Sequence, residues 1–244
     1  MAIVASLLAA GSAMAGTDVL ATVDAFVTLV ASADIRDLVI DQTLDVYDPQ
    51  GRHRQSRTDQ RLFVKVPDRQ RLEQAADGGR EVQIVAGNRA WSRGVNGKIE
   101  ETSLERQRAA ARLLLPFRRS SAELLAEWRS LGVRDSVSHG VQTKGRRVMV
   151  IGAGAGDRQS AAVWLDEQYG VVRLVTREKL PRGPALVDLT FSEHRPLLGG
   201  LFFPYRHEAF VDGRLALLII VRSVVANTGL SDDLFDPDVL RRGR

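Results

Sequence analysis

The pattern of apolar and polar positions changes from a helical to a strand period within the first fifty residues. From Ile35 to Tyr47 apolar residues alternate with aspartates, and the alternation stops at Asp48-Pro49. This pattern predicts a half-buried strand. The preceding stretch, from Thr17 to Ala33, predicts an amphipathic helix with Thr17 as its N-cap. The apolar stripe of that helix consists of Val19, Val23, Phe26, Val27 and Val30.

The next two segments keep the strand period. Residues 59–75 alternate between apolar and polar positions, which favours a strand. Residues 81–101 hold short apolar runs separated by Gly87-Asn88 and Asn96-Gly97, two sequences that favour tight hairpin turns. This part of the chain is therefore predicted to form consecutive antiparallel strands.

The middle of the chain loses the strand period. Residues 104–115 are rich in alanine, arginine and leucine and stop at Pro116, which predicts a first helix. Ser120 and Glu123 form a capping-box pair that starts a second helix. We therefore predict a helical insert at about residues 103–131. The apolar stripe of the second helix consists of Leu124, Leu125, Trp128 and Leu131.

Strand patterns return after Gly132 and continue to Val225. Asp212-Gly213 separates two long apolar arms, as a hairpin turn would. The second arm is apolar on both faces and is therefore expected to be covered on both sides. Arg222 interrupts this arm. We place it on a wet face of the sheet, with the mouth of a cavity as the alternative.

One stretch, from Arg146 to Glu178, begins like a dinucleotide-binding fold, with a hydrophobic strand and a glycine-rich turn. The dinucleotide fingerprint needs glycine at its first, third and sixth positions, and these hold Gly152, Gly154 and Asp157. The last glycine is missing, and the residues that follow have a strand period. We therefore expect a loop and a pair of strands here, and no nucleotide site.

The composition narrows the functional classes. The chain has 244 residues, with 34 basic and 30 acidic groups, a net charge of +4 and no cysteine. Its length allows a core that needs neither metal nor disulfide. The basic residues are scattered and no aromatic residues alternate with them, which argues against a nucleic-acid partner. The histidines lack metal-ligand spacing and no serine lies in a G-x-S-x-G motif, so we expect no catalytic residue, metal or cofactor.

The N-terminus has features of a secretory signal peptide. Residues 3–10 are apolar, and Ala13 and Ala15 provide the small residues of a cleavage site before Gly16. The apolar run is too short to span a bilayer, and the chain has no cysteine for lipid attachment. We predict a signal peptide at residues 1–15 and an unanchored, soluble periplasmic protein. The alternative is an apolar helix at the start of a cytosolic protein.

Two stretches carry a resemblance to a known family. They are "VWLDEQYG" at residues 163–170 and "NTGLSDDLFDP" at residues 227–237. With the order helix, strands, helical insert and strands, the chain resembles the outer-membrane lipoprotein-sorting proteins, relatives of the periplasmic carrier LolA. The resemblance implies a single domain, residues 16–244, with a mainly β (α+β) fold. About eleven antiparallel strands would curl into a half-open barrel, with a helical lid inserted mid-chain.

The resemblance also implies that apolar side chains of a cavity and of its lid contact acyl chains. An ordinary core role is the alternative for each of them. Two arginines, Arg57 and Arg61, are candidates for the residue that tethers the lid in the carrier. The lipid-binding candidates are Trp91, Leu113, Leu114, Leu115, Phe117, Leu125, Trp128, Trp164, Leu218 and Ile220.

The function implied by the resemblance is a non-enzymatic periplasmic carrier of lipoprotein or lipid acyl chains. It would act as a monomer, with an inner-membrane exporter and an outer-membrane acceptor as possible partners. Each buried methylene contributes about 0.8 kcal/mol, so a chain of about fourteen carbons would gain ~11 kcal/mol gross. Release therefore favours a site that lines the chain only in part. The alternatives are an envelope-sensing or protein-interaction module on the same fold and, third, an uncharacterised hydrolase.

Overall fold

The structure, a computed structural model, describes residues 19–102, 117–143 and 145–242. Within these residues, thirteen strands form one antiparallel sheet. The strands are β1 (Asp37–Tyr47), β2 (Arg54–Lys65), β3 (Arg69–Ala76), β4 (Gly79–Ala86), β5 (Arg89–Arg93), β6 (Ile99–Thr102), β7 (Ser138–Thr143), β8 (Arg146–Ile151), β9 (Ala162–Asp166), β10 (Gly170–Leu180), β11 (Gly183–Pro196), β12 (Phe202–Val211) and β13 (Arg214–Ala226). The helical elements are α1 (Val19–Ser32), α3 (Ser121–Ser130), the 3-10 turn η1 (Asp232–Phe235) and α4 (Pro237–Arg241).

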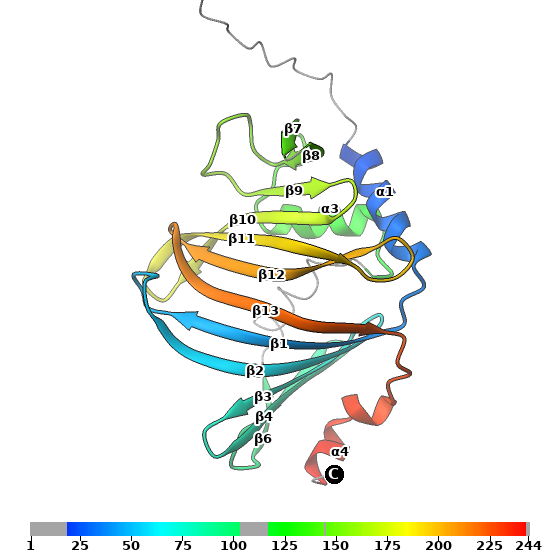
Figure 1. Ribbon diagram of the computed structural model, residues 1–244, viewed down its shortest axis with the longest axis vertical. Helices are drawn as coiled ribbons and strands as arrows, with labels where there is room; N and C mark the ends of the chain where they lie inside the picture. Colours follow the sequence, from blue (N-terminus) through cyan, green and yellow to red (C-terminus); the bar gives the residue numbers. More distant parts are fainter. Residues whose placement is uncertain (1–18, 103–116, 144, 243–244) are drawn as a thin grey trace, which may run out of the picture.

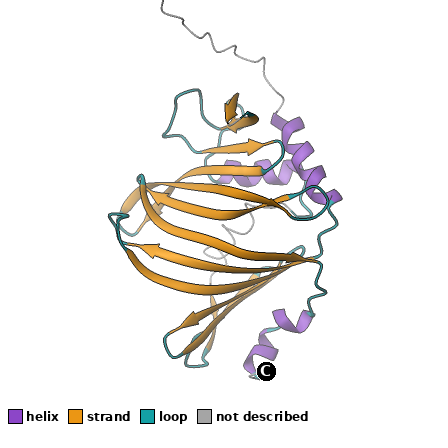
Figure 2. Ribbon diagram, viewed as in Figure 1, coloured by secondary structure: helices purple, strands orange, loops and turns teal. Residues whose placement is uncertain are grey.

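The sheet consists of two meanders. Strands β1 to β6 form the first meander and β7 to β13 form the second, with chain neighbours paired in each. Pairing of β1 with β13 joins the two, and β6 and β7 lie at the outer edges. The sheet curls without closing, with α1 and α3 beside the second meander and α4 beside the first (Figures 1 and 2).

The predicted fold class is confirmed: a mainly β chain with a curled, half-open antiparallel sheet. The number of strands is thirteen, against the expected eleven or so. One reason lies in residues 59–75, where the alternating pattern continues across a turn at Pro67-Asp68. That turn divides the stretch between β2 and β3, because proline donates no ladder hydrogen bond.

The predicted helices agree with the structure where it describes them. Helix α1 lies within the predicted range, and Ser120 caps α3 through the expected capping box with Glu123. Thr17, the signal peptide at residues 1–15 and the first helix of the insert at 104–115 lie outside the described residues. No helix in the described part of the chain is long and apolar enough to cross a membrane.

The expectation that the second apolar arm is covered on both faces is wrong. This arm is β13, where Leu217 is 38% exposed and Val225 is 52% exposed. The two residues point to opposite faces of the sheet and lie near opposite ends of the strand. Arg222 does lie on a wet face, where its guanidinium pairs with the exposed carboxylate of Asp59.

The glycine-rich stretch is a loop between antiparallel strands, as predicted. Strand β8 pairs with β9 in antiparallel register, so no crossover helix follows the glycines. Gly152 has a φ of 109°, and a Cβ there would lie 2.4 Å from the carbonyl oxygen of Ala161. The glycine is therefore required by the close approach of two backbones, a structural reason that needs no nucleotide.

The junction between the meanders depends on Asp37 at the start of β1. Its carboxylate is buried and accepts hydrogen bonds from the backbone N–H and hydroxyl of Thr228 and from the N–H of Gly229. Burial raises the pKa of this carboxyl, but the hydrogen bonds outweigh it and the pKa lies below its usual value. These hydrogen bonds attach the "NTGLSDD" stretch, which directly follows β13, to the start of β1.

Candidate functional site

The two faces of the sheet have different coverings. The face that packs against α1 and α3 is called here the inner face. Side chains on this face of β2 and of β8, which are far apart in the sheet, pack in the same hydrophobic core. They can meet only if the sheet curls towards this face, so the inner face is the concave one. Side chains alternate between the faces along each strand, and the strand registers assign each residue to one of them.

In the second meander, the two helices cover the inner face. Leu124, Leu125 and Trp128 of α3 are 1–5% exposed and pack in the same core as Phe26 of α1. The strands supply Met149, Ile151, Val163, Leu165, Val171, Leu174, Phe191 and Phe203. This half of the inner face is occupied by the protein's own side chains.

In the first meander, Leu38 and Ile40 of β1 join the main core, but other apolar side chains of the inner face are only partly buried. Leu44 and Val46 of β1 are half-buried and lie opposite Ile219 and Leu217 of β13. Leu72 of β3 is also half-buried, and it is part of neither main hydrophobic cluster in the described residues. These side chains form an apolar surface that continues from the core beyond the reach of the helices.

A row of amide side chains crosses this surface. Gln42, Gln60, Gln74 and Glu81 are direct cross-strand partners on β1 to β4. Gln42 Nε2 donates to Gln60 Oε1 at 2.9 Å, and Gln60 Nε2 donates to Gln74 Oε1 at 3.1 Å. Gln74 Nε2 donates to Glu81 Oε2 at 2.7 Å. We call this row the amide ladder; its first two members are almost fully buried.

Charges in the first meander are sorted between the faces. The basic residues of β1 to β4 alternate onto the outer face, where they meet carboxylates. Arg57 makes a two-pronged ion pair with buried Asp45, which holds the pKa of that carboxyl below its usual range. The members of this outer set are Arg54, Arg57, Arg61, Lys65, Arg69, Arg71 and Arg80.

Comparison with known proteins finds similar solved structures but no similar sequence. No family model and no curated protein sequence matches the chain. Among solved structures, a domain described as an outer membrane lipoprotein-sorting protein from Vibrio parahaemolyticus aligns with a TM-score of 0.54 and 15% identity. That alignment covers 84% of this chain and 92% of the other. The chain has the fold of the LolA-like lipoprotein-sorting proteins.

Two further structures share this LolA-like fold. A LolA superfamily protein from Nitrosomonas europaea has a TM-score of 0.57 at 12% identity, covering 92% of this chain and 99% of the other. A DUF1329 family protein from Desulfovibrio piger has a TM-score of 0.61 at 12% identity, covering 92% of this chain and 100% of the other. At these identities the likeness establishes the fold alone.

The structure separates the lipid-binding candidates into four groups. Phe117, Leu125 and Trp128 lie together in the main core below the helices. Trp91 lies instead in a second cluster on the outer face of the first meander, where η1 and α4 cover it with Phe235 and Leu240. Leu113, Leu114 and Leu115 lie outside the described residues.

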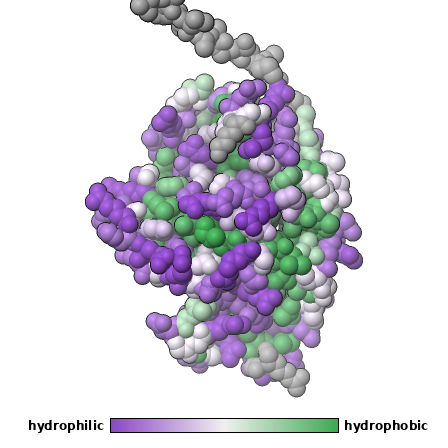
Figure 3. Space-filling model, in the orientation of Figure 1, coloured by the Kyte–Doolittle hydropathy of each residue, from purple (hydrophilic) through white to green (hydrophobic). Residues whose placement is uncertain are grey.

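The remaining candidates lie on the outer face. Trp164 packs below the guanidinium of Arg173, while Leu218 and Ile220 pair across the sheet with Glu208 and Arg206. Both lid-tether candidates lie on this face too: Arg57 bonds to Asp45, and Arg61 lies 3.4 Å from the Asp41 carboxylate. Polar side chains cover much of the face in view, interrupted by apolar patches (Figure 3).

Sequence reasoning missed the amide ladder. Its four residues are 18, 14 and 7 positions apart along the chain, so no local motif joins them. The signal that could have found them is the interruption at Gln42 of the otherwise apolar inner positions of β1. Using it requires the strand register, which the turn lengths determine.

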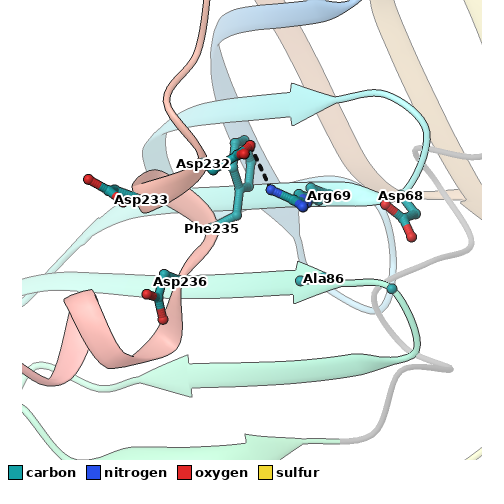
Figure 4. Close-up of a pocket in the computed structure, with 8 residues that line it drawn as sticks. Asp68, Arg69, Ala86, Asp232, Asp233, Phe235 and Asp236 are labelled. Atoms are coloured by element: carbon teal, nitrogen blue, oxygen red, sulfur yellow. Dashed lines mark hydrogen bonds and ion pairs between the residues drawn. The ribbon is translucent and has the colours of Figure 1, made fainter.

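A shallow depression of about 510 Å³ lies between the first meander and η1 (Figure 4). Asp68, Asp232, Asp233 and Asp236 line it, and Arg69 Nη1 lies 2.6 Å from the Asp232 carboxylate. Lys65 also reaches Asp232, at 2.6 Å, and these two cations lower the pKa of its carboxyl. These ion pairs attach the C-terminal segment to β2 and β3, which gives Asp232 a structural role.

Proposed function

We propose that this protein is a non-enzymatic periplasmic carrier that binds an acyl chain of a lipoprotein or lipid along the inner face of its sheet. The observation that carries the proposal is the apolar surface of Leu44, Val46, Leu72 and Leu217, which the described helices leave partly exposed. An exposed apolar surface in a concave setting is typical of a ligand site.

The proposed arrangement suits a carrier because the lining is incomplete. A chain of about twelve methylenes fully removed from water would gain ~10 kcal/mol gross, which slows release. A surface with one half-buried row of aliphatic side chains contributes only part of this amount. The main-core residues Phe117, Leu125 and Trp128 would hold the helical cover in place. An inner-membrane exporter and an outer-membrane acceptor would load and unload the carrier.

The proposal can be tested with native protein and two matched variants. Native mass spectrometry of protein purified from a periplasmic fraction should show co-purified acyl-bearing molecules. A fluorescent probe with an uncharged dodecyl chain should bind at least tenfold more weakly to Leu72→Glu, because the carboxylate faces the inner surface. Val225→Glu introduces the same charge at an exposed outer position and should change the dissociation constant by less than twofold.

Two results would contradict the carrier function. One is repeated absence of bound acyl groups together with no affinity for the dodecyl probe. The other is equal weakening by both variants, which would mean that the probe does not use the inner face. A single membrane-protein partner captured without lipid binding would favour an envelope-sensing role instead.

A further inference from the structure

The amide ladder has a direction. At every step a side-chain nitrogen donates towards Glu81, so the amide dipoles align along the row. The ladder therefore begins with the Oε1 atom of Gln42, to which no described residue donates, and ends at the carboxylate of Glu81. Both ends present acceptor oxygens. Each glutamine in the middle of the row also keeps one unused N–H and one unused lone pair.

The ladder also carries a net negative charge that no basic residue of the described inner face of β1 to β4 offsets. Glu81 is the charged residue of the inner face in β1 to β4, since the basic residues of these strands lie on the outer face. A guanidinium behind a sheet is separated from an inner-face ligand by the backbone layer. A ligand head above the ladder therefore meets an anionic surface.

The position of the ladder fits the polar end of an amphiphile. Leu62 and Leu72 flank it on one side and Leu44 on the other, all on the inner face. A purely hydrocarbon ligand would force the spare polar groups of Gln74 and Glu81, the half-buried members of the ladder, to lose water without replacement, which is unfavourable. A head that supplies hydrogen bonds removes that cost.

We propose that the amide ladder is a headgroup subsite that selects amphiphiles whose head carries N–H donors, such as an ammonium group, and rejects anionic heads. This inference rests on the proposed acyl-chain function. It adds a specificity determinant: the half-buried carboxylate of Glu81 accepts hydrogen bonds from the head, while the acyl chain lies along the flanking leucines.

Three probes with the same decyl chain test the subsite, each titrated calorimetrically below its micelle concentration. Decylammonium offers charge and N–H donors, decyltrimethylammonium offers the charge alone, and decyl sulfate is anionic. We expect affinity to fall in that order, with at least a tenfold difference between the first and the last. Glu81→Gln keeps the acceptor for Gln74 but removes the charge, and should reduce this difference to threefold or less.

The control is Glu167→Gln, which makes the same change of net charge at an exposed turn of the second meander. It should leave the tenfold preference unchanged. Equal affinity for decylammonium and decyl sulfate, or a preference that survives in Glu81→Gln, overturns the subsite while the carrier function stands. Failure of all three probes to bind overturns the carrier function itself.

Discussion

The described helices lie on different faces of the two meanders. Helices α1 and α3 cover the inner face of the second meander, and its core residues there are nearly all buried. The first meander receives its cover from η1 and α4 on the outer face, where Phe235 and Leu240 pack over Trp91. Its inner face keeps partly exposed leucines and the amide ladder.

This difference assigns separate tasks to the two halves of one sheet. A sheet needs a well-packed region for stability. Helices α1 and α3 pack on the inner face of the second meander, and η1 and α4 pack on the outer face of the first around Trp91. The inner face of the first meander around Leu44 and Leu72 can therefore keep polar groups and exposed apolar area that would be costly in a core. The second meander provides a rigid support, and the first provides the proposed binding surface.

The largest expected effect tests this division of tasks by stability. Trp128→Ala removes a buried side chain that is 1% exposed in the core of the second meander, and should lower the free energy of unfolding by about 3–5 kcal/mol. Leu72→Ala, on the half-buried inner face of the first meander, should cost about 1 kcal/mol or less. Urea unfolding measures both. Equal losses would mean that the first meander is packed as tightly as the second.

The division of tasks could be predicted from the sequence only in part. The hairpin dipeptides at Asn96-Gly97 and Asp212-Gly213 and the capping box at Ser120 depend on neighbours in the chain, and all three form as predicted. The cover of each face depends on contacts between segments far apart in the sequence. Nothing near Trp91 indicates that Phe235, 144 positions later, will pack against it.

The dependence on contacts between distant segments also explains why the predicted lipid-binding residues lie on both faces of the sheet. The sequence predicts lipid contacts from apolar side chains, but an apolar side chain can lie on either face of a curled sheet. Trp164 and Leu218 are apolar residues of the outer face, where Trp164 packs below Arg173 and Leu218 lies opposite Glu208. The amide ladder was overlooked because glutamine in a strand has no chemistry of its own until the register aligns four strands.

A smaller effect tests whether the ladder is a connected unit. Gln60→Leu leaves the Nε2 of Gln42 and the Oε1 of Gln74 without their partners on a largely buried surface. We expect a loss of about 1–2 kcal/mol in the free energy of unfolding. Gln83→Leu makes the same change on the same face, where the structure shows no side-chain hydrogen bond among described residues. It should cost less than about 0.5 kcal/mol; similar losses would show that the ladder adds nothing.

The smallest effect distinguishes the meanders by pH. His194 of β11, in the second meander, stacks on Tyr169 with ring centroids 4.4 Å apart. Its Nε2 atom is buried and has no hydrogen-bond partner. Burial lowers the pKa of this imidazole to about 4, with Arg146 and His207 acting in the same direction against Asp166. The folded protein therefore keeps His194 neutral in a pH range where the unfolded chain protonates it.

The sign follows from proton linkage. Between pH 6.5 and pH 4 the unfolded state binds more protons than the folded state, so stability decreases as the pH falls through this window. His194→Phe keeps the aromatic stack and removes the titration. Allowing for partial solvent exposure, the variant should gain about 1 kcal/mol relative to the wild type when urea unfolding at pH 5 is compared with pH 7.5. If the free energy of unfolding changes with pH in the same way in both proteins, His194 is not the cause of the pH dependence. The β-strands of the first meander contain no histidine, so the uncharged change Gln83→Leu there should leave the difference between pH 5 and pH 7.5 unaltered.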